Sequence, residues 1–291
     1  MRADMAEAVS LLEVLRLDPI ERDVFRGYSP APEFSRVRIF GGQVIAQALL
    51  AAYGSVEDRI CHSLHAYFIR PGDTRLPVLY EVERARDGKS FATRRVTAIQ
   101  NGEQIFHLSA SFQAPEQGLE HQFPMPDVPG PDALDDEVEG RRAAAAALPP
   151  EAAEMLMRNR AIEIRRVEKT DWLKPAPAAP VLHAWVRSRE KLPADIALQQ
   201  AVLAYASDML LLGTSLAPHG LTWLDPKLQM ASLDHAIWFH QPTDFSGWHL
   251  YDRDSPASSG GRSFNRGLIY RQDGVLAAST CQEGVIRLRT R

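Results

Sequence analysis

Residues 196–220 read IALQQAVLAYASDMLLLGTSLAPHG, and residues 228–242 read LQMASLDHAIWFHQP. The first segment is apolar almost all round, which predicts a helix that is buried on most of its surface. We expect this helix to run from Ile196 to Leu212. The second segment predicts a strand. A buried helix followed by a strand is therefore the unit from which the rest of the chain is interpreted.

Asp208 is the anomaly of the expected helix. It is the only Asp, Glu, Lys or Arg residue between Asp195 and Asp225. Helical spacing places it mid-helix on the same face as Tyr205 and Leu212, so its carboxylate cannot easily avoid apolar neighbours. An ionised carboxylate that is buried without partners is costly, so we expect it to be paired, protonated or lining a cavity. From the local pattern alone, a charge at the one wet edge of a buried helix explains it equally well.

Length and composition are those of an ordinary globular chain. The 291 residues suit one large domain or two of about 150 residues. The net charge of −4, from 33 basic and 37 acidic residues, creates no basic field, so we expect no nucleic-acid partner. Cys61 and Cys281 cannot make a disulfide framework and have no metal-ligand spacing. We therefore expect no metal and no cofactor.

Several features bear on where the protein works. Residues 1–17 carry acidic residues early and no cleavable small-residue site, so they predict an amphipathic helix and not a secretion signal. The longest apolar run, 201–218, is short for a membrane span and contains Asp208, so we expect no membrane span. The sequence ends in Arg-Thr-Arg and has no peroxisomal tripeptide there. Together these features favour a cytoplasmic location.

The first half of the chain predicts one helix and an antiparallel meander. A first strand is expected within residues 21–30, a helix follows Gly41 and Gly42, and four strands follow within residues 62–115. Asn101-Gly102 is a hairpin signal between two of these strands. Glycines at the start of a buried helix allow close approach of the backbone and leave amide donors free, so Gly41 and Gly42 are candidate binding residues. Plain turn chemistry is the alternative.

The composition changes after residue 115. Seven of the twenty prolines lie at positions 115–150, which predicts a linker that is partly extended and partly helical near residues 143–147. A short helix, EAAEMLMRN, and a strand, AIEIRRVE, lead into the second half. We therefore divide the chain into an N-terminal unit, 1–115, a linker, 116–160, and a C-terminal unit, 161–291.

The second half repeats the order of the first. Four pairs of short motifs match at separations between 169 and 173 residues, namely HAYFIRP with AIWFHQP (Pro71, Pro242), SF with SF (Phe91, Phe264), QNG with QDG (Gly102, Gly274) and ASFQ with STCQ (Gln113, Gln282). A repeat of this size predicts two copies of one α+β unit, each a helix with an antiparallel sheet. We expect the copies to join edge to edge, because pairing removes two open strand edges and buries both helices inside one continuous sheet.

A series of longer motifs occurs in order between about residue 20 and residue 287. They are VFRGYSP, RIFGGQVIAQAL, HSLHAYFIRPGD, RDGKSFATRRVTAIQNG, ASFQAPE, YASDMLLL, PHG, SLDHAIWFHQP and ASTCQEGVIR. Together they resemble the acyl-CoA thioesterase II, or TesB-type, family. This resemblance implies a double hotdog, in which two tandem helix-wrapped sheet units form one sheet. It also implies an enzyme that hydrolyses fatty acyl-CoA to free acid and coenzyme A, and a homo-oligomer, dimer or tetramer.

The resemblance also implies three catalytic residues that orient a hydrolytic water: Asp208 in YASDM, Ser232 in ASLDH and Gln282 in CQEG. Many relatives carry threonine where this chain has Ser232, and serine keeps the hydroxyl but loses the β-branch that stiffens χ1. Thioester hydrolysis needs a placed water, a base and donors for the oxyanion. Asp208 can accept the proton, while Ser232 and Gln282 are neutral groups able to hold the water. The first-half helix has no carboxylate, although Gln113 matches Gln282, which indicates one working site per chain.

Histidines and arginines offer rival or additional site residues. His65 in HSLHAYF is the rival catalytic residue, but it has no evident nucleophile partner, so we keep it only as a candidate substrate contact. His235 and His240 are interpreted as structural. The clusters Arg84–Arg86, Arg94-Arg95, Arg141-Arg142 and Arg165-Arg166 are candidates for the phosphates of coenzyme A, and the sequence does not choose among them.

Two other functions compete with hydrolysis. A hotdog hydratase or dehydratase would use an Asp–His pair, and no histidine lies near Asp208 in the sequence. A non-catalytic acyl-CoA-binding module would have no need of an intact Asp208, Ser232 and Gln282. An α/β-hydrolase is not supported, because the chain has no G-x-S-x-G elbow.

Overall fold

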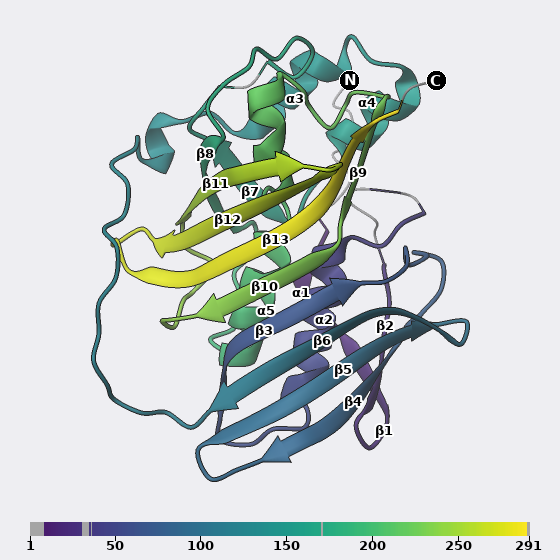
Figure 1. The fold of residues 1–291 in the computed structure, drawn as a ribbon, viewed down its shortest axis with the longest axis vertical. Coiled ribbons are helices and arrows are strands. Elements are labelled where there is room, and N and C mark those ends of the chain that lie inside the picture. Colours follow the sequence, from purple (N-terminus) through teal and green to yellow (C-terminus); the bar gives the residue numbers. More distant parts are fainter. Residues whose placement is uncertain (1–8, 31–34, 36, 170, 290–291) are drawn as a thin grey trace.

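The computed structural model describes residues 9–30, 35, 37–169 and 171–289 (Figure 1). Of the amino-terminal helix expected over residues 1–17, the described part is α1 (Leu11–Val14), and residues 1–8 lie outside the described residues. The other elements of the first half are β1 (Leu17–Glu21), β2 (Val24–Gly27), α2 (Gly41–Tyr53), β3 (Ile60–Phe68), β4 (Val78–Asp87), β5 (Phe91–Gln100) and β6 (Glu103–Gln113).

The elements that follow alternate short helices with the strands of the second half. They are η1 (Pro131–Ala133), α3 (Glu137–Ala145), α4 (Pro150–Met157), β7 (Ile162–Arg166), β8 (Val181–Ser188), α5 (Ile196–Ser207), η2 (Leu212–His219), β9 (Leu228–Ser232), β10 (Asp234–Phe239), β11 (His249–Ser259), β12 (Arg262–Arg271) and β13 (Leu276–Leu288). The expected helix and meander are therefore present in both halves. Asn101 and Gly102 both have positive φ, as a two-residue hairpin turn requires.

All of these strands belong to one antiparallel sheet (Figure 1). Its order is β1-β2-β4-β5-β6-β3-β10-β13-β12-β11-β8-β7, and β9 pairs with β13 beside this path. The halves meet where β3 pairs with β10, with Ala236 opposite His65 and Trp238 opposite Ser63. The two units thus join edge to edge, as the repeat predicts, and neither half leaves an open edge at the junction.

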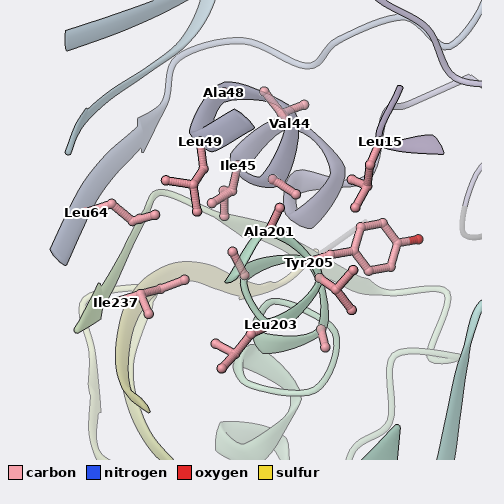
Figure 2. Packing of buried hydrophobic residues seen from close by; sticks show 14 of the residues in the cluster. Leu15, Val44, Ile45, Ala48, Leu49, Leu64, Ala201, Leu203, Tyr205 and Ile237 are labelled. Atoms are coloured by element: carbon pink, nitrogen blue, oxygen red, sulfur yellow. The ribbon is translucent and has the colours of Figure 1, made fainter. Parts of the chain in front are cut away.

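Helices α2 and α5 pack against each other and against the inner face of this sheet. The two helices run antiparallel, because Gly41 at the start of α2 lies against Asp208 at the end of α5, while the Tyr53 hydroxyl at the end of α2 bonds Gln200 near the start of α5. Figure 2 shows Ile45 of α2 facing Ala201 of α5 in the core between them. Fully burying one such aliphatic side chain contributes about 1.5–3 kcal/mol, which holds the helix pair in place.

The second helix ends earlier than its apolar pattern predicts. α5 stops at Ser207, and Asp208 is its C-cap residue, so the expectation of a mid-helix Asp208 in a helix reaching Leu212 was wrong. Side chains of β11 bind carbonyls that a continuing α-helix would need: the Tyr251 hydroxyl donates to Ser207 O at 2.7 Å. Arg253 Nη1 donates to Leu210 O at 3.1 Å. The chain instead turns and continues as the 3₁₀-helix η2.

The segment after α5 also makes the repeat unequal. In the first half only a short turn separates Tyr53 from β3, whereas η2 and β9 lie between α5 and β10 in the second half. The single strand expected over residues 228–242 is two strands, because Leu233 separates β9 from β10. η2 packs against β11, β12 and β13, and so covers the part of the inner face that α5 leaves open.

The linker is tied to the second half of the sheet. Trp185 Nε1 donates to Pro129 O at 2.8 Å, and Arg165 Nη1 donates to Pro131 O at 2.8 Å. The side chain of Gln122 bonds the backbone of Gly274 and Leu276 at the hairpin between β12 and β13. The proline-rich segment therefore follows a defined path along the surface of the second unit before α3 begins.

One segment of the described chain, Ile196–His219, has the length and mean hydropathy of a membrane-crossing helix. In the structure, 61% of its most apolar window is buried inside the protein. It is also interrupted at Asp208, where α5 gives way to a turn. These are the features of a core helix that is covered by its own protein.

A charged histidine connects β8 and β11 on the second half of the sheet. His183 Nε2 lies 3.4 Å from Asp252 Oδ1, and its Nδ1 lies 2.6 Å from Glu168 Oε1. The hydrogen bonds to Asp252 and Glu168 raise the pKa of His183 to about 9, from an ordinary value of 6.5. The protonated imidazole therefore stabilises the fold below pH 6.5, and this contribution is lost as the pH rises through about 9.

We expect His183→Gln to lower the free energy of unfolding by about 1–2 kcal/mol near pH 6, after allowance for solvent screening. The difference in free energy of unfolding between the wild type and the variant should be smaller near pH 10, where the wild-type histidine is neutral. Urea unfolding of both proteins at the two pH values measures this difference. A gap that is the same at both values would contradict the assigned ion pairs.

Candidate active site

Three polar side chains from distant parts of the chain meet at the end of α5. Asp208 is the C-cap of α5, Ser232 ends β9, and Gln282 lies in β13. Gln282 Nε2 donates to Asp208 Oδ1 at 2.6 Å and to Ser232 Oγ at 3.1 Å. Ser232 Oγ lies 3.5 Å from the same carboxylate oxygen. The structure thus brings together the three residues that the sequence selected.

Gln282 connects the other two members of this cluster. Its side chain is fully buried, and both of its N–H groups are used by Asp208 and Ser232. This orientation of the amide follows from the partners, because the reverse one would place its oxygen against a carboxylate oxygen. Gln282 Oε1 accepts no hydrogen bond from the described residues. It therefore offers a buried acceptor next to the carboxylate.

The second oxygen of Asp208 faces the beginning of α2. A Cβ atom on Gly41 would lie 2.7 Å from Asp208 Oδ2 and 2.9 Å from the ring of Phe68. A Cβ atom on Gly42 would lie 2.5 Å from Tyr205 O. Both glycines are thus needed for the close approach of the two helix ends, and plain turn chemistry does not account for them.

The amino-terminal end of α2, next to Asp208, is expected to carry partial positive charge. Its N-cap, Phe40, provides no side-chain cap, and its first turn contains no acidic residue. The first N–H groups of a helix have no intrahelical partner, and the helix dipole adds partial positive charge there. The N–H groups at the start of α2, where Gly41 lines the cavity, are therefore candidate donors to an oxyanion near Asp208.

These groups border a cavity of about 820 Å³. Gly41, Asp208 and Ser232 line it, together with the turn after α5, η2 and the segment 166–182. Its walls combine apolar side chains with a set of basic ones, and this second set consists of Arg38, Arg160, Arg166, Lys169, Lys174 and Arg253. The composition suits a ligand that has an apolar part and an anionic part.

Of the arginine clusters that the sequence left undecided, only Arg166 belongs to this cavity wall. Arg84 forms an ion pair with Asp23 on the rim of the first half. Arg94 and Arg141 are buried and hydrogen-bonded elsewhere. Spacing along the chain could not separate these cases, because a pair of adjacent arginines looks the same on a solvated face and beside a cavity.

Arg253 is the site residue that sequence reasoning missed. It follows Tyr251 on β11, and both side chains point inward while Asp252 between them is only half-buried. Strand alternation from Tyr251 is the signal that could have found it, because residues two apart share a face of the sheet. Only the tertiary structure shows that Arg253 lines the cavity.

The structure does not bring His65 to the site. His65 is exposed on the outer face of β3, edge-on to Trp238 at 5.2 Å, and it does not line the cavity. His235, by contrast, approaches from β10, because its Nε2 lies 2.9 Å from Ser207 Oγ, next to Asp208. The Ser207 hydroxyl donates to Ala204 O, so His235 Nε2 carries the proton. Burial lowers the pKa of His235, which keeps the ring neutral.

The first half lacks this arrangement at the equivalent place. The C-cap of α2 is Gly54, where α5 has Asp208. Gln113 is half-buried and donates to Glu116 at 3.2 Å, whereas Gln282 is fully buried. Gln113 and Gln282 therefore correspond in sequence but differ in burial and in hydrogen-bond partners. A smaller cavity of about 380 Å³ lies beside Gln113 and His62.

Comparisons with known proteins agree with this architecture. A family model described as acyl-CoA thioesterase matches residues 157–285, and a model of the acyl-CoA thioesterase N-terminal domain matches residues 30–113. Acyl-CoA thioesterase 2 of Haemophilus influenzae is 41% identical over 279 residues, which cover 96% of this chain and 97% of that protein. Human acyl-coenzyme A thioesterase 8 is 42% identical over 298 residues, which cover 97% of this chain and 90% of that protein.

Solved structures agree as well. The acyl-CoA thioesterase II TesB2 of Mycobacterium marinum superposes with a TM-score of 0.77 and 38% identity, covering 96% of this chain and 97% of that one. A hot dog fold protein of Alicyclobacillus acidocaldarius, 20% identical, superposes with a TM-score of 0.76 over 96% of this chain and 98% of that one, which shows the fold alone. The expected α+β double hotdog is confirmed. By its sequence over nearly its whole length and by its fold, the chain belongs to the acyl-CoA thioesterase II (TesB-type) family and is an acyl-CoA thioester hydrolase.

Proposed function

We propose that the enzyme hydrolyses fatty acyl-CoA thioesters to free fatty acid and coenzyme A through a water molecule activated by Asp208. The observation that carries this proposal is the double donation by Gln282 Nε2 to Asp208 Oδ1 and Ser232 Oγ. It anchors one carboxylate oxygen and leaves Oδ2 directed toward Gly41, on the cavity wall. A held carboxylate with one free oxygen is what a general base for water requires.

In the proposed reaction, Asp208 accepts a proton from water while the water oxygen attacks the thioester carbonyl carbon. The negative charge that develops on the carbonyl oxygen is stabilised by the amides at the start of α2. The C–S bond then breaks, the electron pair leaves on sulfur, and the proton held by Asp208 returns to the departing thiolate. Ser232 and Gln282 position the water and form no covalent intermediate. An acyl group trapped on Ser232 and detected by mass spectrometry would contradict this route.

We propose that exposed cations at the rim of the cavity bind the phosphates of coenzyme A. Arg38, Lys169 and Lys174 line the cavity and are exposed to solvent. Phosphate contacts by exposed basic side chains remain hydrated and lose strength as salt screens them. KM for acyl-CoA should therefore rise with ionic strength.

The proposed role of Gln282 can be tested by substituting it and, as a control, the matching Gln113 of the first half. Gln282→Met keeps the side-chain length but removes both donors, and we expect kcat for palmitoyl-CoA to fall about 100-fold, as for loss of one oxyanion donor. Thiol release measures this rate. Gln113→Met, at the matching position of the first half, serves as the control and should keep wild-type kcat. Equal loss in both variants, or no thiol release by the wild type at any chain length, would contradict the proposal.

A hydratase would need a histidine beside Asp208 in the cavity. The nearby histidine, His235, is fully buried behind Ser207 and does not line the cavity. Its geometry suits a group that holds the end of α5. Hydration of crotonyl-CoA without release of thiol would nevertheless favour that rival function over hydrolysis, and tight binding of acyl-CoA without turnover would favour a non-catalytic binding module.

We further propose that the enzyme works in the cytoplasm as a homo-oligomer, a dimer or tetramer. Exposed aromatic side chains on the outer side of the sheet support an interface there, including Tyr67 and Phe264, which are 54% and 38% exposed. Light scattering on the purified protein measures the mass. A mass equal to the chain's own 32.4 kDa at micromolar concentration would contradict assembly.

A further inference from the structure

Asn265 is a buried amide with one weak partner. Its side chain on β12 is fully buried, whereas its neighbours in the strand, Phe264 and Arg266, are exposed. Its Nδ2 lies 3.4 Å from Ser263 Oγ, which is long for a hydrogen bond from nitrogen, and its Oδ1 accepts from none of the described residues. Asparagine is disfavoured in strands, and a buried polar group without full hydrogen bonding is costly. The stability of the strand therefore gives no reason for an amide at this position.

The residue directly opposite Asn265, on β13, is Gln282. Opposed residues of an antiparallel pair share a face of the sheet and have Cβ atoms about 4.5–5.5 Å apart, so two amide side chains at such positions can reach each other. Gln282 Oε1 is also a buried acceptor without a donor among the described residues. Two buried amides, each with an unsatisfied oxygen, thus lie side by side on the inner face of the sheet.

The first half of the chain shows that this strand position does not require an amide. In the matching SF motifs, Ala92 stands where Asn265 stands, and Ala92 is fully buried in β5. The residue opposite Gln113 is Phe91, an aromatic side chain that has no donor. The half that has no carboxylate at the end of its helix therefore also has no amide beside its glutamine, and its sheet forms without one. Asn265 thus accompanies the Asp208 site and is not a requirement of the fold.

We propose that Asn265 is a positioning residue of the active site, whose Nδ2 donates to Gln282 Oε1 while its Oδ1 accepts from the Ser263 hydroxyl. This inference rests on the proposed role of Gln282 in hydrolysis. The oxygen and nitrogen of an amide have the same shape, so its partners decide its orientation, and a hydroxyl can donate as well as accept. In this orientation each of the two buried amide oxygens gains the donor that it lacks otherwise.

The bond from Asn265 matters most when Asp208 has taken a proton. While Asp208 is ionised, its Oδ1 by itself keeps Nε2 of Gln282 turned toward it. A protonated Oδ1 can instead donate to Gln282 Oε1, which would favour the reverse orientation of the amide. With Oε1 bound to Asn265, the glutamine stays a donor, and the proton is taken by Asp208 Oδ2. That oxygen faces Gly41 on the cavity wall, where the proton can return to the departing thiolate.

The experiment is a double-mutant cycle between Asn265 and Gln282, with thiol release from palmitoyl-CoA as the measurement. Asn265→Leu keeps a side chain of similar shape but removes the donor. We expect kcat to fall about tenfold with KM unchanged, because a buried acceptor of the catalytic cluster loses its hydrogen bond. In the Gln282→Met background the same substitution should have no further effect on kcat, since Asn265 acts only through the glutamine. A merely structural role would lower kcat by the same factor in both backgrounds.

Thr214→Val is the matched control. The Thr214 hydroxyl is also fully buried and has no partner among the described residues. It belongs to η2, which packs against β12 and β13, so it is the rival donor for Gln282 Oε1. We expect Thr214→Val to keep wild-type kcat. A loss in this variant that vanishes in the Gln282→Met background would assign the donor to Thr214 and overturn the proposal.

Circular dichroism checks that each variant folds. Asn265→Ala, which copies Ala92 of the first half, takes the place of Asn265→Leu in the cycle if the larger side chain prevents folding. An unchanged kcat in the folded variant, or an equal loss in both backgrounds, would overturn the positioning role. If Gln282→Met itself keeps wild-type kcat, the proposed function of the glutamine fails, and the positioning role falls with it.

Discussion

Asp208→Asn is expected to lower kcat for palmitoyl-CoA by two to three orders of magnitude. Asparagine has the same shape, but it cannot accept the proton of the attacking water, so the general base is lost. The loss of a group that acts in the transition state should appear in kcat and kcat/KM alike, with KM little changed. Thiol release under saturating substrate measures the effect.

The fold of Asp208→Asn should remain intact. Asp208 ends α5, and a negative charge at the carboxyl end of a helix opposes the helix dipole, by about 0.3–1 kcal/mol at an exposed position. Removing that charge should leave the midpoint of thermal unfolding unchanged or slightly higher. Equal turnover in both proteins would place the active site elsewhere. A large fall in the unfolding midpoint would show that the carboxylate is structural.

Gly41→Ala is expected to cost about 100-fold in kcat/KM, because displacing a catalytic group by about 1 Å can reduce the rate by that factor. The new Cβ would lie 2.7 Å from Asp208 Oδ2 and 2.9 Å from the Phe68 ring. Both neighbours are side chains and can move, so the protein should still fold while the carboxylate is displaced. Stability should fall by about 1–3 kcal/mol, as in other overpacked sites.

The control for this substitution is Gly140→Ala in α3. Among the described residues, a Cβ at Gly140 would meet the side chain of Trp172, with Nε1 at 3.4 Å and Cδ1 at 3.9 Å, and these are ordinary van der Waals distances. Alanine in a helix is favoured over glycine by about 0.5–1 kcal/mol, so this variant should be fully active and no less stable. If Gly41→Ala keeps wild-type kcat/KM, the close contact between α2 and Asp208 has no part in catalysis.

Much of this fold could be predicted from the sequence. Alternating and helical patterns gave the strands and both helices, and the repeated letters around Pro71 and Pro242 indicated two copies of one unit. The ordered motifs then selected Asp208, Ser232 and Gln282, which the structure brings within hydrogen-bonding reach. The fold prediction succeeded because periodicity and repeated motifs are local properties of the chain, whereas the catalytic role of these three residues stays a prediction.

Other features could not be read from the chain. α5 ends at Ser207 because Tyr251 and Arg253, more than forty residues later, bind the carbonyls that a longer helix would use. Helix propensity and apolar pattern depend only on residues within one turn or a few turns. They therefore carry no information about side chains of β11 that bind the same backbone carbonyls. The mid-helix position of Asp208 was therefore wrong, although its role as a candidate base was not affected.

The sequence by itself determined the two-unit architecture, and its family resemblance selected Asp208, Ser232 and Gln282 as candidate site residues. Only the tertiary structure decided that Asp208 Oδ1 is held by Gln282 while Oδ2 faces Gly41, that His65 lies on the outer face, and that the buried Arg253 lines the cavity. The physical reason is that hydrogen bonds, burial and cavities arise between residues far apart in sequence, through the pairing of β3 with β10 and the packing of α2 on α5. Local pattern specifies the elements, and their packing specifies which side chains meet.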